Sequence, residues 1–399
     1  MSSCIVQLDN YQGQYYPGNN VVGRVVCSFT QSKSIREIRL KLRGIEHTSW
    51  IGTESYYDNQ SKETRTRSVE YTGHNHFLAV NISLRGSGDV GPGRLEYPFN
   101  FVLPKNMPGS YNGKYGWIKF TIKATVDRPF KSDYEDVKEF VVVSPIDFNE
   151  MKDELTLRPV AYSDDKTLCC CCCASGPITM NVHLEKEAYI QGETANVRVE
   201  ITNMSNENVE RVEVKMGMTV ESRVTSPSSE SKCDYELLAT DNDTGVGAHG
   251  DRTYDFQLEI PKFTVVPNFN LCTLFKQWTI LKVKAVLPSC HEDMDISTTI
   301  VMGHIPIGGQ VQFQNMSLQQ SGFYPPQQTN QFPPGGNMKL LFHNLNLYQH
   351  IINDRFSNIA LLLRRRLLLM GSPPSLLYCS LYFRIYLLDL YKENRARLK

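Results

Sequence analysis

Five consecutive cysteines, Cys169 to Cys173, form the densest group of reactive side chains in the sequence. Thiolates bind zinc, but consecutive residues cannot all aim at one ion, so a zinc site is a poor interpretation. Adjacent thiols could instead carry reversible acyl chains, and two chains anchor a protein to a membrane where one binds only marginally. The alternative is a structural segment of small hydrophobic residues between two domains. The sequence leaves both roles open for Cys169, Cys170, Cys171, Cys172 and Cys173.

The other cysteines and histidines are too sparse to predict a metal centre. The nearest group is Cys290 with His291 and Cys272, whereas structural zinc takes four ligands with paired spacing. An ordinary thiol in a turn is the better interpretation of these residues. The sequence also lacks the motifs of serine hydrolases, zinc proteases, phosphate-binding loops and dinucleotide-binding folds. We therefore expect a protein that is not an enzyme and that uses no metal or cofactor.

Cationic side chains alternate with apolar ones in two segments. In IREIRLKLRGIE they are Arg39, Lys41 and Arg43, and in WIKFTIKATV they are Lys119 and Lys123. This alternation predicts strands with one buried face and one solvent-exposed face. The cationic face could receive an acidic or phosphorylated receptor tail, or anionic lipid, through charge-assisted hydrogen bonds. The alternative is a solvated strand face on which interspersed acidic residues balance the charge.

The charge balance and the first residues narrow the class of protein. Lys and Arg total 42, as do Asp and Glu, so the chain lacks the basic surplus that a general nucleic-acid binder needs. The opening residues, MSSCIVQLDN, show no cationic start followed by an apolar core, so we expect no signal peptide. A chain made in the cytosol would keep its thiols reduced.

Strand patterns follow one another through the first 150 residues and then return in the same order. The segment WIKFTIKATV (117–126) reappears as WTILKVKAVL (278–287), and YPFNFVLP (97–104) reappears as YDFQLEIP (254–261). A shift of 174 residues also aligns two earlier blocks, placing Tyr15, Gly18, Ile38, Leu40 and Leu42 on Tyr189, Gly192, Val212, Val214 and Met216. Gly18 and Gly192 both lead into strands, where a turn with positive φ favours glycine. Four blocks in one order predict a single β-sandwich used twice.

The composition of the segments predicts the domain boundaries. We predict a first sandwich over about residues 4–150 and a second over about 177–308, each of ordinary domain size. Residues 151–176 carry mixed charge and the cysteine run, and we predict that they form an interdomain linker. Residues 309–399 begin Gln/Pro/Gly-rich, which predicts disorder, and turn Leu/Arg-rich from about residue 337. That last part is either an amphipathic tail or the product of an alternative exon or read-through.

The tandem sandwich resembles the arrestin fold, and within it the α-arrestins. The resemblance rests on YPFNFVLPKNMPGSYNGKYGWIKFTIKATVDRP (97–129), KTLCCCCCASGPITMNVHLEKEAYIQGE (166–193) and SCHEDMDISTTIVMGHIPI (289–307). It implies a cytosolic trafficking adaptor with peripheral association at the plasma membrane or endosomes. Such an adaptor binds cytosolic tails of membrane receptors or transporters and links them to HECT-type ubiquitin ligases, which sends the cargo into endosomes.

The tail departs from the pattern of that family. α-Arrestins usually carry Pro-Pro-x-Tyr motifs, which dock into WW domains of the ligases. Here Tyr324 precedes Pro325 and Pro326 instead of following them, and no Tyr follows Pro333 and Pro334. Ligase recruitment through WW domains is therefore in doubt for this chain. The two Pro-rich stretches remain candidate polyproline ligands, with a plain linker as the alternative.

The resemblance also implies a second class of function. Thioredoxin-interacting protein, an α-arrestin, pairs with reduced thioredoxin through a reactive thiol. The candidate thiols here are Cys233, which lies beside the cationic Lys232, and Cys290. A redox-linked binder of thioredoxin-like partners is thus the alternative to the trafficking adaptor.

Overall fold

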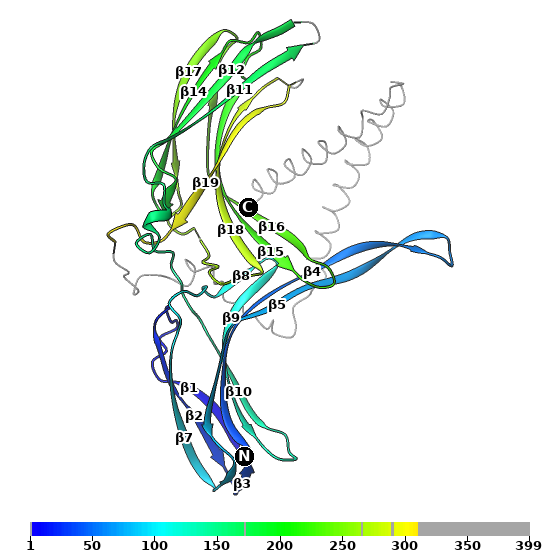
Figure 1. Cartoon of the computed structure of the whole chain (residues 1–399), viewed down its shortest axis with the longest axis vertical. Coiled ribbons are helices and arrows are strands. Elements are labelled where there is room, and N and C mark those ends of the chain that lie inside the picture. The colour runs from blue at the N-terminus through cyan, green and yellow to red at the C-terminus, as the bar shows by residue number, and fades with distance from the viewer. Residues whose placement is uncertain (1, 171–172, 265, 289–290, 310–399) are drawn as a thin grey trace, which may run out of the picture. The chain divides into compact units, whose positions relative to one another are not determined.

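The structure is a computed structural model that describes residues 2–309 except 171–172, 265 and 289–290. Almost every element in this part of the chain is a β-strand, and its one helical turn is η1 (Lys152–Glu154). The strands form two sandwiches of two sheets each, and both belong to the same compact unit (Figure 1). The prediction of an all-β chain with two tandem sandwiches is confirmed. The predicted tail lies almost entirely outside the described residues.

The first sandwich pairs a three-stranded sheet with a five-stranded one. The smaller sheet has the order β1 (Ser3–Leu8), β2 (Asn20–Phe29) and β7 (Gly93–Val102). The larger has the order β10 (Tyr134–Phe140), β9 (Gly116–Asp127), β4 (Glu37–Asp58) and β5 (Glu63–Arg85), with β8 (Tyr111–Gly113) beside β9. A short ladder joins β3 (Lys33–Ile35) to β6 (Gly88–Val90).

The second sandwich repeats this plan. One sheet has the order β11 (Val160–Cys170), β12 (Cys173–Leu184), β14 (Thr194–Asn203) and β17 (Gly250–Glu259). The other has the order β13 (Ala188–Ile190), β19 (Met294–Gly303), β18 (Phe275–Val286), β15 (Arg211–Val224) and β16 (Glu230–Thr244). Each sandwich has its own hydrophobic cluster of buried side chains.

The sequence repeat is visible in backbone geometry. Gly18 and Gly192 have φ of 81° and 83°, and their N–H groups donate to Leu103 O and Ile260 O, both at 3.1 Å. Leu40 lies opposite Ala124, whereas its counterpart Val214 lies opposite Val283, two residues from the counterpart of Ala124. A register difference of an even number of residues keeps the same side chains in the core. The two copies can therefore differ in strand pairing without losing their buried faces.

The second sandwich starts before the predicted boundary. β11 lies within the segment predicted as a linker and pairs with β12 from Val160 opposite Leu184 onwards. Leu168 is buried in the second core, and Val160 and Tyr162 pack against it. The residues of β11 between Tyr162 and Leu168 are mostly polar, so the sequence pattern does not indicate this edge strand. Within the cysteine run, Cys170 of β11 lies opposite Cys173 of β12, whereas Cys171 and Cys172 lie outside the described residues.

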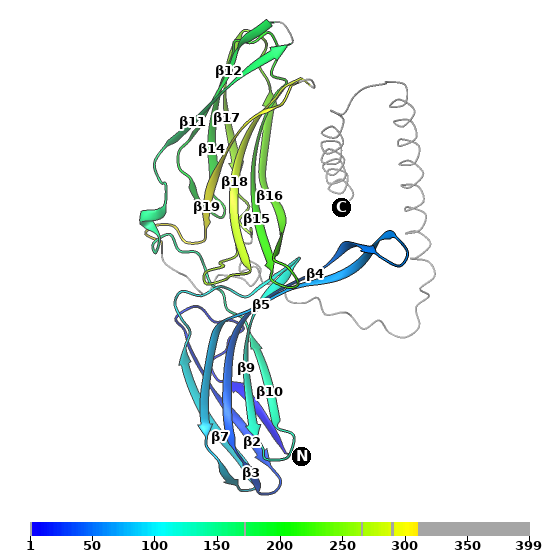
Figure 2. The ribbon, with the colours of Figure 1, turned by 45° about the vertical axis from the view of Figure 1, so that its right-hand side comes forward.

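The β4–β5 hairpin extends beyond the sheet that carries it. β9 pairs with β4 only from Glu37 to Thr48, whereas β4 and β5 stay paired as far as Asp58 and Glu63. Figures 1 and 2 show the hairpin projecting from the first sandwich. Its outer part is mostly exposed, including Ile51 and Tyr57.

Candidate functional site

A buried carboxylate holds the junction between the two sandwiches. Glu46 of β4 is fully buried, and its Oε1 accepts hydrogen bonds from Asn75 Nδ2 at 2.7 Å, Thr273 N at 2.8 Å and Thr273 Oγ1 at 2.9 Å. Its Oε2 accepts one from Leu274 N at 2.8 Å. These donors satisfy a charge that would otherwise be costly to bury. β4 of the first sandwich is thereby fixed to the segment that enters β18 of the second.

Further contacts extend this junction along β4 and β5. Thr48 Oγ1 donates to Arg223 O at 2.6 Å, and Thr72 N donates to Ser226 O at 2.8 Å. Lys232 of β16 places its Nζ 5.1 Å from the centroid of the Trp50 ring, which is a cation–π contact. Phe275 of β18 is buried in the cluster of the first sandwich. Polar, cationic and apolar contacts therefore all cross the boundary.

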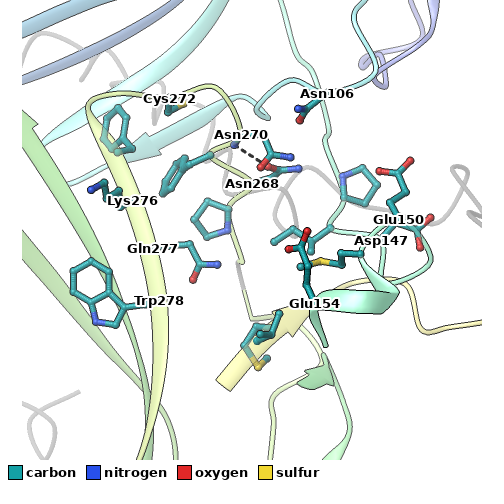
Figure 3. A pocket seen from close by; sticks show the side chains of 18 residues that line it. Asn106, Asp147, Glu150, Glu154, Asn268, Asn270, Cys272, Lys276, Gln277 and Trp278 are labelled. Carbon is teal, nitrogen blue, oxygen red and sulfur yellow. Dashed lines mark hydrogen bonds between the residues drawn. The ribbon is translucent and has the colours of Figure 1, made fainter. Parts of the chain in front are cut away.

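A cleft of about 800 Å³ opens beside this junction (Figure 3). Asp147, Glu150 and Glu154 line one side, whereas Gln277 and Trp278 of β18 line the other. Asp147 Oδ1 accepts hydrogen bonds from Asn149 N and Nδ2, both at 2.8 Å. Glu150 and Glu154 form no ion pair within the described residues.

The thiol in this cleft is poorly suited to chemistry. Burial raises the pKa of Cys272, and the adjacent Glu46 carboxylate raises it further. Because the thiolate is the nucleophile, a raised pKa disfavours reaction at this cysteine. No group of three or more potential metal ligands occurs among the described residues. The side chains of the cleft suit the recognition of a partner by charge and shape.

The predicted cationic residues do lie on one sheet face, but acidic neighbours neutralise most of them. Arg39 pairs with Asp127 at 2.8 Å, Lys119 with Glu139 at 3.5 Å and Lys123 with Glu135 at 2.8 Å. Arg43 donates to Leu42 O, Val80 O and Asn81 Oδ1. Lys41 lies opposite Lys123 and has no ion pair within the described residues. This arrangement favours the solvated face over the acidic-ligand face.

Of the two predicted thiols, Cys233 is exposed on β16, an edge strand, whereas Cys290 lies outside the described residues. Cys4 and Cys27 lie opposite each other on β1 and β2, with their Sγ atoms 3.8 Å apart. Both are buried, so a partner protein has no access to them. Tyr324, Pro325, Pro326, Pro333 and Pro334 also lie outside the described residues.

Sequence reasoning missed Glu46, although a signal was present. In IREIRLKLRGIEHTSW, the even-numbered residues Ile38, Leu40 and Leu42 form the buried face. Glu46 continues that even series, so the pattern places a carboxylate where an apolar residue is expected. A carboxylate at a buried strand position indicates a specific set of hydrogen-bond donors nearby.

Comparisons with known proteins agree with this architecture. Residues 4–149 match the N-terminal domain of arrestin (or S-antigen), and residues 174–307 match its C-terminal domain. The chain is 27% identical over 309 residues to human arrestin domain-containing protein 4, covering 75% of this chain and 71% of the relative. It is 26% identical over 216 residues to arrestin domain-containing protein 17 of Caenorhabditis elegans, covering 51% and 50% of the two chains.

A third relative is thioredoxin-interacting protein of Sus scrofa, which is 24% identical over 194 residues, 47% of each chain. None of the helical segments in the described part of the chain has the length and hydropathy of a membrane span. Both arrestin domains are matched, each on one of the two sandwiches. The chain therefore belongs to the arrestin family, among the α-arrestins.

Proposed function

We propose that this protein is a non-catalytic cytosolic adaptor for membrane receptors or transporters. It binds their cytosolic segments and links them to endocytic or ubiquitin-ligase machinery at the plasma membrane or endosomes. The observation that carries this proposal is the match of both sandwiches to arrestin domains. The cleft beside the junction supports it, because its carboxylates and amides offer recognition groups.

Affinity capture tests this proposal. We expect the full chain to recover membrane receptors or transporters together with endocytic proteins or ubiquitin ligases. A 1–308 truncation, which lacks the Pro-rich stretches, should keep the membrane proteins, because their binding is assigned to the sandwiches. Loss of ligases alone from the truncation would place ligase recruitment in the tail despite the absence of Pro-Pro-x-Tyr. Recovery of neither class above a bead control would contradict the proposal.

The same affinity capture tests a second candidate function, the binding of a thioredoxin-like partner through a thiol. Cys233 is exposed on an edge strand, and one relative is named for its interaction with thioredoxin. A redox-linked binder should be recovered as a mixed disulfide with a thioredoxin-like protein on a non-reducing gel. Cys233→Ser should remove that adduct, whereas Cys272→Ser, which changes a partly buried thiol, should not.

Acylation of the cysteine run is a further part of this proposal. Within the run, Cys170 of β11 lies opposite Cys173 of β12, and adjacent thiols could carry two acyl chains. We expect hydroxylamine to release fatty acyl groups from the wild-type protein expressed in cells. Replacing Cys169 to Cys173 by Ser should abolish the release and shift the protein from the membrane fraction, because two chains are needed for stable anchoring. An unlabelled wild-type protein would refute acylation.

A further inference from the structure

Two histidines of β5 bring their ring nitrogens close together on one face of the sheet. His74 and His76 are exposed, and as residues i and i+2 of a strand they lie on the same face. Their Nε2 atoms are 3.1 Å apart, and their ring planes meet at 84°. The two Nε2 atoms are therefore close enough to bind the same ion.

The separation of these nitrogens fits a shared metal ion. With metal–nitrogen bonds of about 2.0–2.1 Å, two imidazoles lie about 2.9 Å apart at a right angle and about 3.3 Å apart at a tetrahedral angle. The observed 3.1 Å falls between these values. Imidazole nitrogen is a preferred ligand of zinc, copper and nickel. We propose that His74 and His76 chelate a divalent first-row transition ion such as Cu²⁺ or Zn²⁺, with water in the remaining positions.

The Arg43 side chain, which lies near His76, is engaged with the sheet. Its guanidinium donates to Leu42 O, Val80 O and Asn81 Oδ1, which keeps its donors away from the two imidazoles.

His47 is a neighbour of the site and is not assigned as a ligand. It lies opposite His74 on β4, with ring centroids 6.0 Å apart, and its ring packs against Trp117 at 5.2 Å. Burial and His74 lower the pKa of His47. Since no three metal-ligating side chains group together within the described residues, the site has two protein ligands.

The position of this site connects it to the domain junction. Asn75 lies between the two histidines, and its Nδ2 donates to Glu46 Oε1 at 2.7 Å and to Thr273 Oγ1 at 3.1 Å. An ion held by His74 and His76 fixes the backbone on both sides of Asn75. Metal binding should therefore stabilise the contact between the sandwiches, because anything that binds only the folded state raises its stability.

Copper titration of the full chain tests the site. Cys169 to Cys173, Cys233, Cys290 and Cys379 are first replaced by Ser, so that their thiolates do not compete for the probe. We expect one Cu²⁺ to bind with an electron paramagnetic resonance spectrum that shows two nitrogen ligands. The variants H74Q and H76Q should each lower the affinity roughly tenfold or more, measured by competition with a chelating dye.

The controls separate this site from its neighbours and from other histidines. H47Q should change the affinity by no more than about twofold, and H183Q, on a strand of the second sandwich, should not change it. Saturating Zn²⁺ should raise the melting temperature of the parent and leave that of the H74Q/H76Q protein unchanged. Equal affinities in parent and double variant would overturn the proposal. So would the absence of binding, which would mean that the 3.1 Å contact is a hydrogen bond between the two rings.

Discussion

Glu46→Ala is expected to lower the free energy of unfolding by about 2–4 kcal/mol, because it leaves the buried Leu274 amide and three less buried donors without their acceptor. Glu46 is fully buried and accepts from Asn75, Thr273 and Leu274. Its replacement should also free the segment before β18 from β4. Hydrogen exchange reports this directly, because the amides of Thr273 and Leu274 both donate to this carboxylate and should lose protection first.

Two further variants show whether the carboxylate itself is responsible. Glu46→Gln keeps the shape, but its NH₂ group must face some of the same donors, so an intermediate loss of stability is expected. Glu96→Ala removes a carboxylate of the same sandwich that pairs with Arg24 and Arg94 at the surface. It should leave the urea midpoint and the protection of Thr273 and Leu274 unchanged. Glu46→Ala with a loss below about 1 kcal/mol would show that the junction does not depend on this residue.

The sandwiches could be predicted because their strands follow simple alternation. Ile38, Leu40 and Leu42 are buried as the pattern requires, and so are Val212, Val214 and Met216 in the second copy. Turn chemistry was also readable, since Gly18 and Gly192 adopt the positive φ that their positions predict. Both signals depend only on residues that are close in the sequence, so they can be recognised without knowledge of the rest of the fold.

The junction could be predicted only in part, since its partners are distant in the chain. Thr273 lies 227 residues after Glu46. A buried-face carboxylate indicates that donors must exist, but no local pattern indicates which loop supplies them. The cationic face has the same difficulty, because the pairing of Lys119 with Glu139 and of Lys123 with Glu135 depends on the β9–β10 register.

The start of the second sandwich was hidden for a different reason. β11 is an edge strand with Ser163, Asp164 and Asp165 at its centre, and such residues are also typical of a linker. Edge strands often carry charge, which prevents them from pairing with other chains. A composition-based boundary therefore falls after such a strand and not before it.

Phe120→Ala is expected to cost about 3–5 kcal/mol, and its repeat counterpart Leu281→Ala about 2–5 kcal/mol. Phe120 is fully buried, with ring centroids 5.6 Å from Phe77 and 5.7 Å from Phe140. Leu281 is 1% exposed in the other cluster. Each truncation leaves a cavity that β-sheet neighbours fill poorly, because the paired strands fix the backbone on both sides. Phe130→Ala, at a fully exposed aromatic of the first sandwich, should leave stability unchanged.

Tryptophan fluorescence can show which sandwich each variant weakens. Of the three tryptophans in the chain, Trp50 and Trp117 lie on strands of the first sandwich and Trp278 on β18 of the second. Phe120→Ala should lower the urea midpoint seen by Trp117 more than that seen by Trp278, and Leu281→Ala should do the reverse. The two residues belong to separate clusters, so the effects in the double variant should add to within about 0.5 kcal/mol. Identical shifts at both probes for each variant would contradict separate unfolding of the two sandwiches and would show that the junction at Glu46 and Phe275 makes them unfold as one.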